Sequence, residues 1–135
     1  MTTAARTHPP DVLWPDPPPL SRAKLVALLR RRLPVHVREA YVFGSYARGS
    51  ATADSDVDLI LVAPSQRSFP DRFRDFPDLD DGLPPLDLLI YTPAEWRRFL
   101  AHPTPLLRTA MREWVVLRGR PPGASSAGDG PIARR

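Results

Sequence analysis

A glycine–serine pair and two carboxylates stand at a spacing that could support chemistry at a phosphate group. The pair is Gly44 and Ser45, and ten residues separate it from Asp56, with Asp58 two positions further on. On a strand, side chains two positions apart point to the same face, about 6.6 Å apart along the chain. Carboxylate and phosphate oxygens are the ligands of Mg²⁺, and two such ions about 3.5 to 4 Å apart can stabilise the attacking and the leaving oxygen of an in-line displacement. The spacing therefore indicates a site for two metal ions.

A third carboxylate, Asp87, would complete such a site. It is the lone charge in the apolar run Leu86–Tyr91, which should form a strand beside the one that carries Asp56 and Asp58. Three converging acids without a cation would raise one another's pKa, so the arrangement favours a bound cation. Taken singly, the acid pair also fits solvated charges at a strand edge, and Asp87 also fits a solvent-facing position. The combination of three acids with the Gly-Ser pair favours the metal site.

The Gly-Ser pair itself could hold phosphate. A strand that turns at a glycine into the start of a helix leaves backbone N–H groups unpaired, and phosphate oxygens can bind there. Gly44 permits a close approach of the backbone, and Ser45 adds a hydroxyl that can bond a terminal phosphate. Alone, the pair is far more typical of an ordinary turn with a helix cap. Its meaning depends on the acids downstream.

The elements that must position these residues have clear local signals. Ser21 is a good helix N-cap, and leucines at helical spacing after it predict a packing helix that stops before Pro34. Thr92, Pro93 and Glu95 supply an N-cap, an N1 proline and an N3 glutamate, which together predict a helix start. The other predicted elements are strands over residues 35–43, 56–63, 86–91 and 114–117, a short amphipathic helix over 68–76, and a helix from 105 onward.

Two groups of side chains in these elements have a structural and a functional interpretation. Phe69, Phe73 and Phe76 fall at i, i+4 and i+7, which favours a core stripe over a platform for stacking bases. The arginines of residues 30–32 fall largely off the apolar helix face, which favours a solvated face over a phosphate contact.

Size and composition limit the possible classes of protein. We expect a proline-rich flexible arm over residues 1–19, one domain over 20–118 and a flexible tail over 119–135. The absence of cysteine excludes disulfides and thiolate metal sites, and no apolar run approaches a membrane span, so we expect a soluble, cytoplasmic protein. The net charge of +4 comes almost wholly from arginine, without the interleaved aromatics of a polynucleotide-binding surface. Nucleic acid is therefore not an expected partner.

Residues 43–59, FGSYARGSATADSDVDL, carry the GS-x10-DxD pattern and resemble the nucleotidyltransferase superfamily that includes DNA polymerase beta. In length and layout the chain resembles the single-domain branch, the minimal nucleotidyltransferases, often encoded beside a HEPN-domain protein as toxin and antitoxin. The resemblance covers about residues 21–119. It implies the α+β polymerase beta-like nucleotidyltransferase fold, a mixed sheet flanked by helices.

The resemblance also implies an activity and roles for the residues. The reaction would be transfer of AMP from MgATP to an acceptor hydroxyl, with release of pyrophosphate. Asp56 and Asp58 would hold two Mg²⁺ ions, while Asp87 would hold the catalytic ion and help deprotonate the acceptor. Arg48, on the first turn after Gly44 and Ser45, could reach the triphosphate or face solvent. Ser55 could bond the nucleotide or orient the loop, and the loop role is favoured.

The acceptor is expected on another molecule, because the chain leaves no room for a second domain that would grip it. The minimal branch suggests a tyrosine of a HEPN ribonuclease toxin, and a further copy of this chain is the other source of an acceptor surface. Two alternatives remain open at this stage. One is an antitoxin that acts by binding and keeps the acids without using them, and the other is an adenylyltransferase that modifies an antibiotic.

Overall fold

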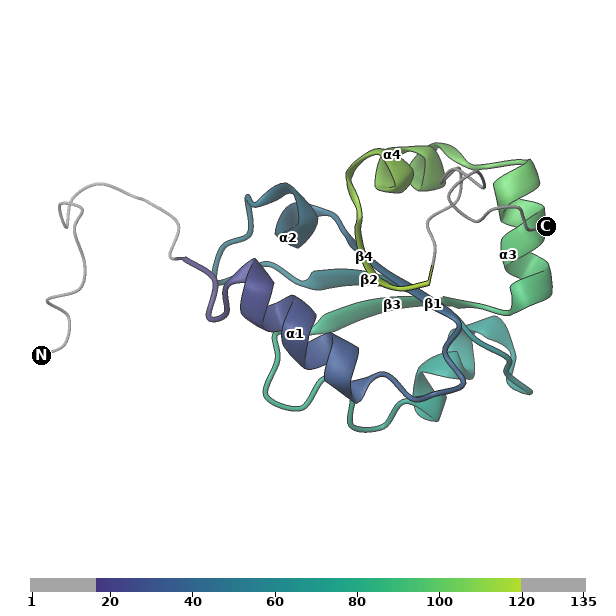
Figure 1. The fold of residues 1–135 in the computed structure, drawn as a ribbon, viewed down its shortest axis with the longest axis horizontal. Coiled ribbons are helices and arrows are strands. Elements are labelled where there is room, and N and C mark those ends of the chain that lie inside the picture. The colour runs from purple at the N-terminus through teal and green to yellow at the C-terminus, as the bar shows by residue number, and fades with distance from the viewer. Residues whose placement is uncertain (1–16, 120–135) are drawn as a thin grey trace, which may run out of the picture.

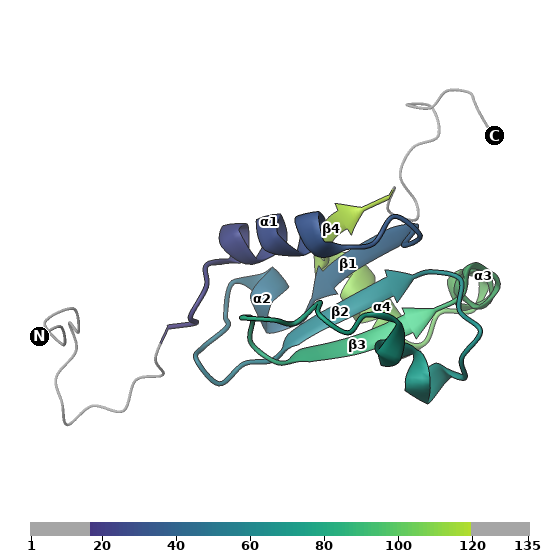
Figure 2. The ribbon, with the colours of Figure 1, turned by 90° about the horizontal axis from the view of Figure 1, so that it is seen from below.

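A four-stranded mixed sheet in the order β3-β2-β1-β4 forms the centre of the computed structural model, which describes residues 17–119. The strands are β1 (Glu39–Phe43), β2 (Val57–Val62), β3 (Leu86–Tyr91) and β4 (Val115–Arg118). β1 runs antiparallel to both β2 and β4, whereas β2 and β3 are parallel (Figure 2). The helices are α1 (Arg22–Arg32), α2 (Ser45–Arg48), the 3-10 helix η2 (Phe69–Asp75), α3 (Pro93–Ala101) and α4 (Pro105–Glu113). The fold is α+β with helices flanking the sheet, as predicted.

Local capping explains where three of these helices begin. The side chain of Ser21 accepts a hydrogen bond from the N–H of Lys24 at the start of α1. Thr92 and Glu95 form a complete capping box at the start of α3, and Thr104 caps α4 in the same way without the glutamate. Each bond satisfies a backbone donor that the first helical turn cannot pair internally. The predicted starts of all three helices are confirmed.

The sheet separates two apolar cores. Figure 1 shows α1 on one side of the sheet and α3 and α4 on the other. Alternate residues of β2 serve the two sides: Leu59 and Leu61 pack with α1, and Ile60 and Val62 pack with α3 and α4. The coverage of both faces of β2 explains its continuous apolar run. Tyr41 of β1 is fully buried on the α3–α4 side.

Two sequence predictions differ from the structure in their detail. The strand predicted over residues 35–43 starts only at Glu39, because Val37 closes a turn onto the carbonyl of Pro34 and Val35 is 99% exposed. The segment predicted as an amphipathic helix is the 3-10 helix η2, in which Phe69 and Phe73 are 42% and 53% exposed. A 3-10 helix has three residues per turn, so Phe69 and Phe73, four positions apart, do not share one face. Phe76 follows the helix as its C-cap, with the non-helical angles φ −132° and ψ 61°. Of the predicted phenylalanine stripe, only Phe76 is core, with 6% exposure.

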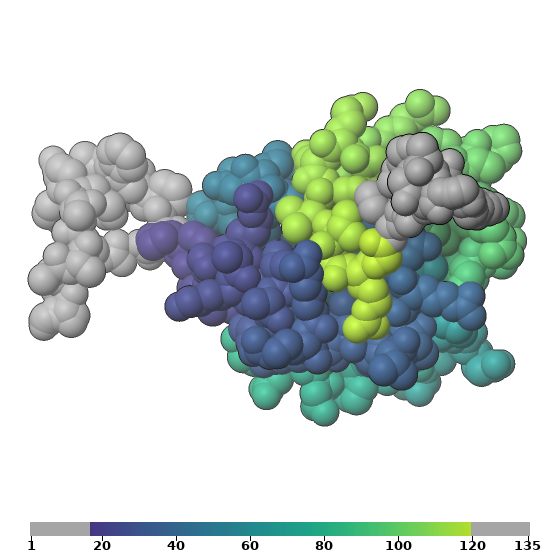
Figure 3. Space-filling view, in the orientation of Figure 1, coloured from purple at the N-terminus to yellow at the C-terminus, as the bar shows by residue number. Residues whose placement is uncertain are grey.

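Arg30 and Arg31 are exposed, as the predicted solvated face requires, but two arginines of residues 30–32 also bond to backbone carbonyls. Arg30 donates to the carbonyls of Val116 and Leu117 in β4, and Arg32 donates to those of Leu79 and Asp81. Figure 3 shows the resulting surface, on which β4 lies directly beside α1. Guanidinium groups suit this role because their donors spread over a rigid plane. Part of the basic charge therefore ties the fold together.

Two sequence predictions fall largely beyond the described part of the chain. The arm predicted over residues 1–19 and the tail predicted over 119–135 lie outside residues 17–119 except for their innermost positions. Between residues 17 and 119, none of the helices has the length and apolar character that crossing a membrane requires.

Candidate active site

The Gly-Ser turn lies against Asp58, the acid within β2. Phe43, the last residue of β1, pairs with Asp58 of β2, so the turn at Gly44 lies beside the Asp58 carboxylate. A Cβ on Gly44 would stand 2.1 Å from Oδ2 of Asp58, well inside any real contact distance. Gly44 also has φ +75° and ψ −151°, a conformation open almost only to glycine. The turn therefore requires glycine for two separate reasons.

Asp58 and Asp87 are direct neighbours across the parallel strands β2 and β3. They are register partners, and adjacent strands lie about 4.8 Å apart. Both point to the α3–α4 side, because the residues two positions on from each, Ile60 and Leu89, pack in that core. Asp56 lies just before β2, and the alternation along the strand brings it to the same side. The acids predicted from sequence meet at one end and on one face of the sheet.

Burial and neighbouring acids both disfavour the charged form of Asp58 at this end of the sheet. Burial raises the pKa of the Asp58 carboxyl above its usual value, and the neighbouring charges of Asp87 and Asp56 raise that pKa further, while Arg48 lowers it. Asp56 and Asp87 are exposed, so cations have access to the group. Oxygen ligands of this kind suit Mg²⁺, whose charge would relieve the repulsion. The residues present fit the implied metal.

Asp56, Asp58 and Asp87 share one end of the sheet but are not arranged as a complete metal site. Between residues 17 and 119, the structure contains no group of three or more acidic, histidine or cysteine side chains arranged to hold a metal ion. Carboxylates that share a site repel one another, and a bound cation would compensate their charge. The predicted metal roles of Asp56, Asp58 and Asp87 therefore stay predictions.

A fourth carboxylate, Glu113, joins the site without having been predicted from the sequence. Its Oε2 accepts a hydrogen bond from the Gly44 N–H at 3.2 Å and another from Nη1 of Arg48 at 2.9 Å. Glu113 ends α4, and β4, which begins two residues later, pairs with β1 so that Val115 faces Val42. The pairing of β4 with β1 is the feature from which the position of Glu113 at the turn could have been predicted.

The remaining loop residues have separate functions. The Oγ of Ser55 accepts a hydrogen bond from the N–H of Thr52 at 2.8 Å, so Ser55 organises the loop before β2. This agrees with the favoured interpretation, and a nucleotide contact by Ser55 stays a prediction. The hydroxyl of Ser45 has no hydrogen-bond partner among residues 17–119. Gly49 ends α2 with φ +81°, a left-handed conformation that suits glycine.

Comparison with known proteins identifies the family. The family model of the nucleotidyltransferase domain matches residues 22–113, which is more than half of the chain. The chain is a nucleotidyltransferase domain. The match contains the glycine turn, all four carboxylates and the strands β1, β2 and β3.

Solved structures resemble this nucleotidyltransferase domain at low identity. A toxin–antitoxin structure with AMP-PNP is 24% identical over 75% of each chain, with a TM-score of 0.49. A Sulfolobus solfataricus protein described as a nucleotidyltransferase is 20% identical over 71% of this chain and 81% of its own, with a TM-score of 0.48. A Shewanella oneidensis complex of a tri-AMPylated HEPN toxin with an MNT antitoxin is 22% identical over 74% of this chain and 71% of its own, with a TM-score of 0.42. Among curated proteins, none is significantly similar to the chain.

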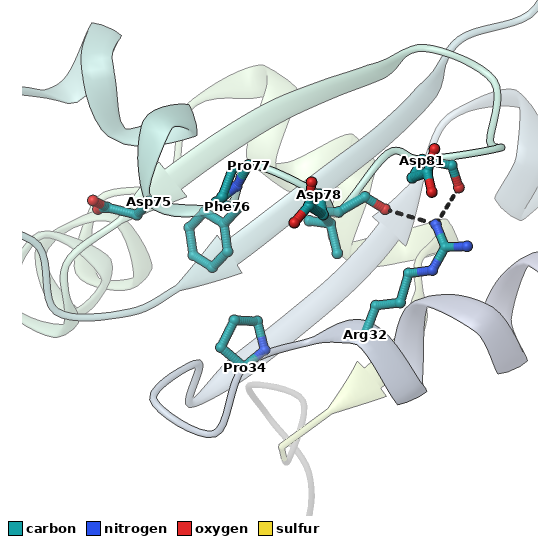
Figure 4. A pocket seen from close by; sticks show the side chains of 8 residues that line it. Arg32, Pro34, Asp75, Phe76, Pro77, Asp78 and Asp81 are labelled. Atoms are coloured by element: carbon teal, nitrogen blue, oxygen red, sulfur yellow. Dashed lines mark hydrogen bonds between the residues drawn. The ribbon is translucent and has the colours of Figure 1, made fainter.

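A cavity of about 390 Å³ lies on the other side of the nucleotidyltransferase domain (Figure 4). Phe76 and Leu79 in its wall pack in the α1 core, whereas the acids face the α3–α4 side. Arg32 bridges two carbonyls at its edge. Its lining residues are Arg32, Pro34, Asp75, Phe76, Pro77, Asp78, Leu79 and Asp81. The cavity is thus separate from the glycine turn.

Proposed function

We propose that this nucleotidyltransferase domain transfers AMP from MgATP to the hydroxyl of a tyrosine on a partner HEPN toxin, and so acts as its antitoxin in the cytoplasm. The observation that carries the proposal is the register of β2 and β3, which sets Asp58 opposite Asp87 on one face, beside the Gly44 turn. A pair of solvated charges at a strand edge would not require a glycine in contact with one of them. The same end carries Arg48, which lowers the pKa of Asp58 and so acts as a nearby positive charge.

Each residue would have a distinct task in this reaction. Asp56 and Asp58 would hold two Mg²⁺ ions and Asp87 one of them, and the ions would supply positive charge to the reacting oxygens. Ser45 would donate its hydroxyl, and Arg48 its guanidinium, to the triphosphate oxygens. The acceptor oxygen would attack the α-phosphorus, the bond from that phosphorus to the bridging oxygen would break, and pyrophosphate would leave. Asp87 would take the proton from the acceptor hydroxyl.

The choice of ATP, and of a HEPN tyrosine as acceptor, rests on the sequence resemblance to minimal nucleotidyltransferases. Residues 43–59 carry the GS-x10-DxD pattern of that group, and the family match adds the general transferase chemistry. The described surface also fits an acceptor delivered by another molecule, because Asp56 and Asp87 are both exposed.

The test uses a double substitution of Asp56→Asn with Asp58→Asn. The amide keeps the size of the side chain and removes the charge that would hold metal. We expect the variant to fold, with a small gain in stability without metal because repulsion at Asp58 falls. It should lose Mg²⁺-dependent ATP binding in calorimetry, and it should transfer no label from ATP labelled at the α-phosphorus to a HEPN toxin.

Asp78→Asn with Asp80→Asn is the matched control. These two acids are also two positions apart and exposed, and the substitution removes the same charge on the α1 side of the sheet. The control should bind ATP, transfer label and protect cells that express the toxin. If the Asp56 and Asp58 variant binds the toxin and still protects cells while no label moves, the domain works by occlusion and the catalytic proposal is wrong.

A further inference from the structure

One carboxylate oxygen of Glu113 holds two groups at the glycine turn. Oε2 accepts from the Gly44 N–H at 3.2 Å and from Nη1 of Arg48 at 2.9 Å. The two partners come from opposite ends of the turn, since Gly44 follows β1 and Arg48 ends α2. The side chain of Glu113 is only 20% exposed, whereas that of Arg48 is 50% exposed. The glutamate is therefore the fixed member of the pair.

The backbone around Glu113 is well placed to act as an anchor. Glu113 is the last residue of α4, and Trp114 after it returns its N–H to the carbonyl of Ala110. The ring of Trp114 stacks on the fully buried Tyr41 at a centroid distance of 4.0 Å. Aromatic stacking on a buried ring restrains the backbone that carries it. Glu113 thus extends from a packed junction toward the turn.

Arg48 needs such an anchor if it is to meet a ligand. An exposed arginine loses side-chain entropy when it is held in one rotamer. Glu113 engages only Nη1, and the other two guanidinium nitrogens have no hydrogen-bond partner among residues 17–119. The anchored guanidinium therefore keeps two nitrogens available for anionic oxygens. Because Arg48 is already held in the free protein, it loses less side-chain entropy when a ligand binds.

We propose that Glu113 is a positioning residue, which holds Arg48 and the Gly44 turn ready for the triphosphate end of the nucleotide. The inference rests on the proposed function and adds a residue to it. Glu113 touches neither the acceptor nor the reacting phosphorus and acts through Arg48 and Gly44. Because Arg48 is proposed to bind the triphosphate, we expect the effect of Glu113 to be larger for ATP than for AMP.

The test compares Glu113→Ala, Glu113→Gln and Glu113→Asp in the full chain. Calorimetry with Mg²⁺ should show MgATP binding about tenfold weaker for Glu113→Ala, while AMP binding stays unchanged. Glu113→Gln keeps an acceptor oxygen and should be intermediate, whereas Glu113→Asp is one methylene too short and should match the alanine variant. In label transfer, KM for ATP should rise while kcat changes little, as expected for lost binding of the triphosphate.

Two further measurements separate positioning from general damage. In an Arg48→Ala background, Glu113→Ala should weaken MgATP binding by much less than tenfold, because the arginine through which Glu113 acts is gone. The amide proton of Gly44 should move upfield in the NMR spectrum of Glu113→Gln even without nucleotide, because the charged acceptor is lost. Asp75→Asn is the matched control, since its ion pair with Arg67 has similar exposure, 25% and 45%, and it should bind MgATP as the wild type does.

Three results would overturn the inference. MgATP binding by Glu113→Ala that is equal to the wild type would remove the positioning role. Tighter binding would show that the carboxylate competes with phosphate for Gly44 and Arg48. Equal weakening of AMP and ATP would show a merely structural effect. By contrast, a wild-type domain that fails to bind MgATP at all would overturn the proposed function itself.

Discussion

Replacing Gly44 by alanine tests whether the glycine turn and the strand acids form one unit. The alanine Cβ would meet Oδ2 of Asp58 at 2.1 Å and its Cγ at 3.1 Å. The Asp58 carboxylate would have to move away from the turn, and its register partner Asp87 limits the movement on the side of β3. We therefore expect Gly44→Ala to lower both the stability of the fold and the MgATP binding that depends on the acids.

The expected magnitude follows from two contributions. A residue other than glycine at φ +75° and ψ −151° costs on the order of 1 to 3 kcal/mol. Forcing an extra carbon into a filled space adds about 1 to 3 kcal/mol. We expect Gly44→Ala to lower the free energy of unfolding by about 3 kcal/mol or more. Gly49→Ala is the control, because Gly49 is left-handed at φ +81° but has nothing within 4 Å of its Cβ position, so about 1 kcal/mol is expected.

Urea denaturation followed by tryptophan fluorescence measures both free energies of unfolding, and calorimetry with MgATP measures the function. Gly44→Ala should be less stable than Gly49→Ala by about 2 kcal/mol and should bind MgATP poorly under conditions in which it is folded. Equal stability of the two variants, with nucleotide binding intact in both, would refute the argument that Asp58 presses against the turn.

Two further predictions concern parts of the fold away from the site. The hydrogen bond from Arg72, together with that from Thr92, lowers the pKa of Glu95 to about 2, so the pair stabilises the fold above pH 4.5 and the stability is lost as the pH falls from about 4.5 toward 2. Glu95→Gln should cost about 3 kcal/mol at neutral pH and flatten this acid limb in pH-dependent urea titrations; a limb as steep as in the wild type would contradict the assignment. Phe76→Ala should cost about 3 kcal/mol and the half-exposed Phe73→Ala less than about 1 kcal/mol in the same assay. Similar costs for the two phenylalanines would contradict the observed burial, in which Phe76 is 6% and Phe73 53% exposed.

Short-range signals in the sequence predicted most of the elements. β3 has the predicted bounds Leu86–Tyr91, and α3 starts at the predicted capping box of Thr92 and Glu95. The acids were predictable because a strand repeats every two residues, which places Asp56 and Asp58 on one face whatever the rest of the fold does. That Asp87 joins them required only that β3 lie beside β2, which the structure confirms.

Features that depend on distant contacts could not be predicted in this way. Glu113 bonds to Gly44 across 69 residues of sequence, and no local pattern distinguishes it from a solvated glutamate at the end of a helix. The phenylalanine spacing in residues 69–76 suits an α-helix, whereas the segment is a 3-10 helix whose Arg72 donates to the carbonyl of Ile90 in β3. Neither the contact of Glu113 nor the type of this helix follows from local spacing.

The hydrogen bonds that the α1 arginines donate to backbone carbonyls also affect how the candidate site can open. Arg22 near the start of the helix donates to the carbonyl of Ala47 in α2, and Arg30 near its end donates to that of Val116 in β4. Both attachment points adjoin the glycine turn. α2 follows Gly44 directly, and β4 follows Glu113, which accepts the hydrogen bond from the Gly44 N–H. We expect these hydrogen bonds, to a helix whose leucines pack in the core, to limit local fluctuations of the turn. The candidate nucleotide site and α1 should then open together in amide hydrogen exchange.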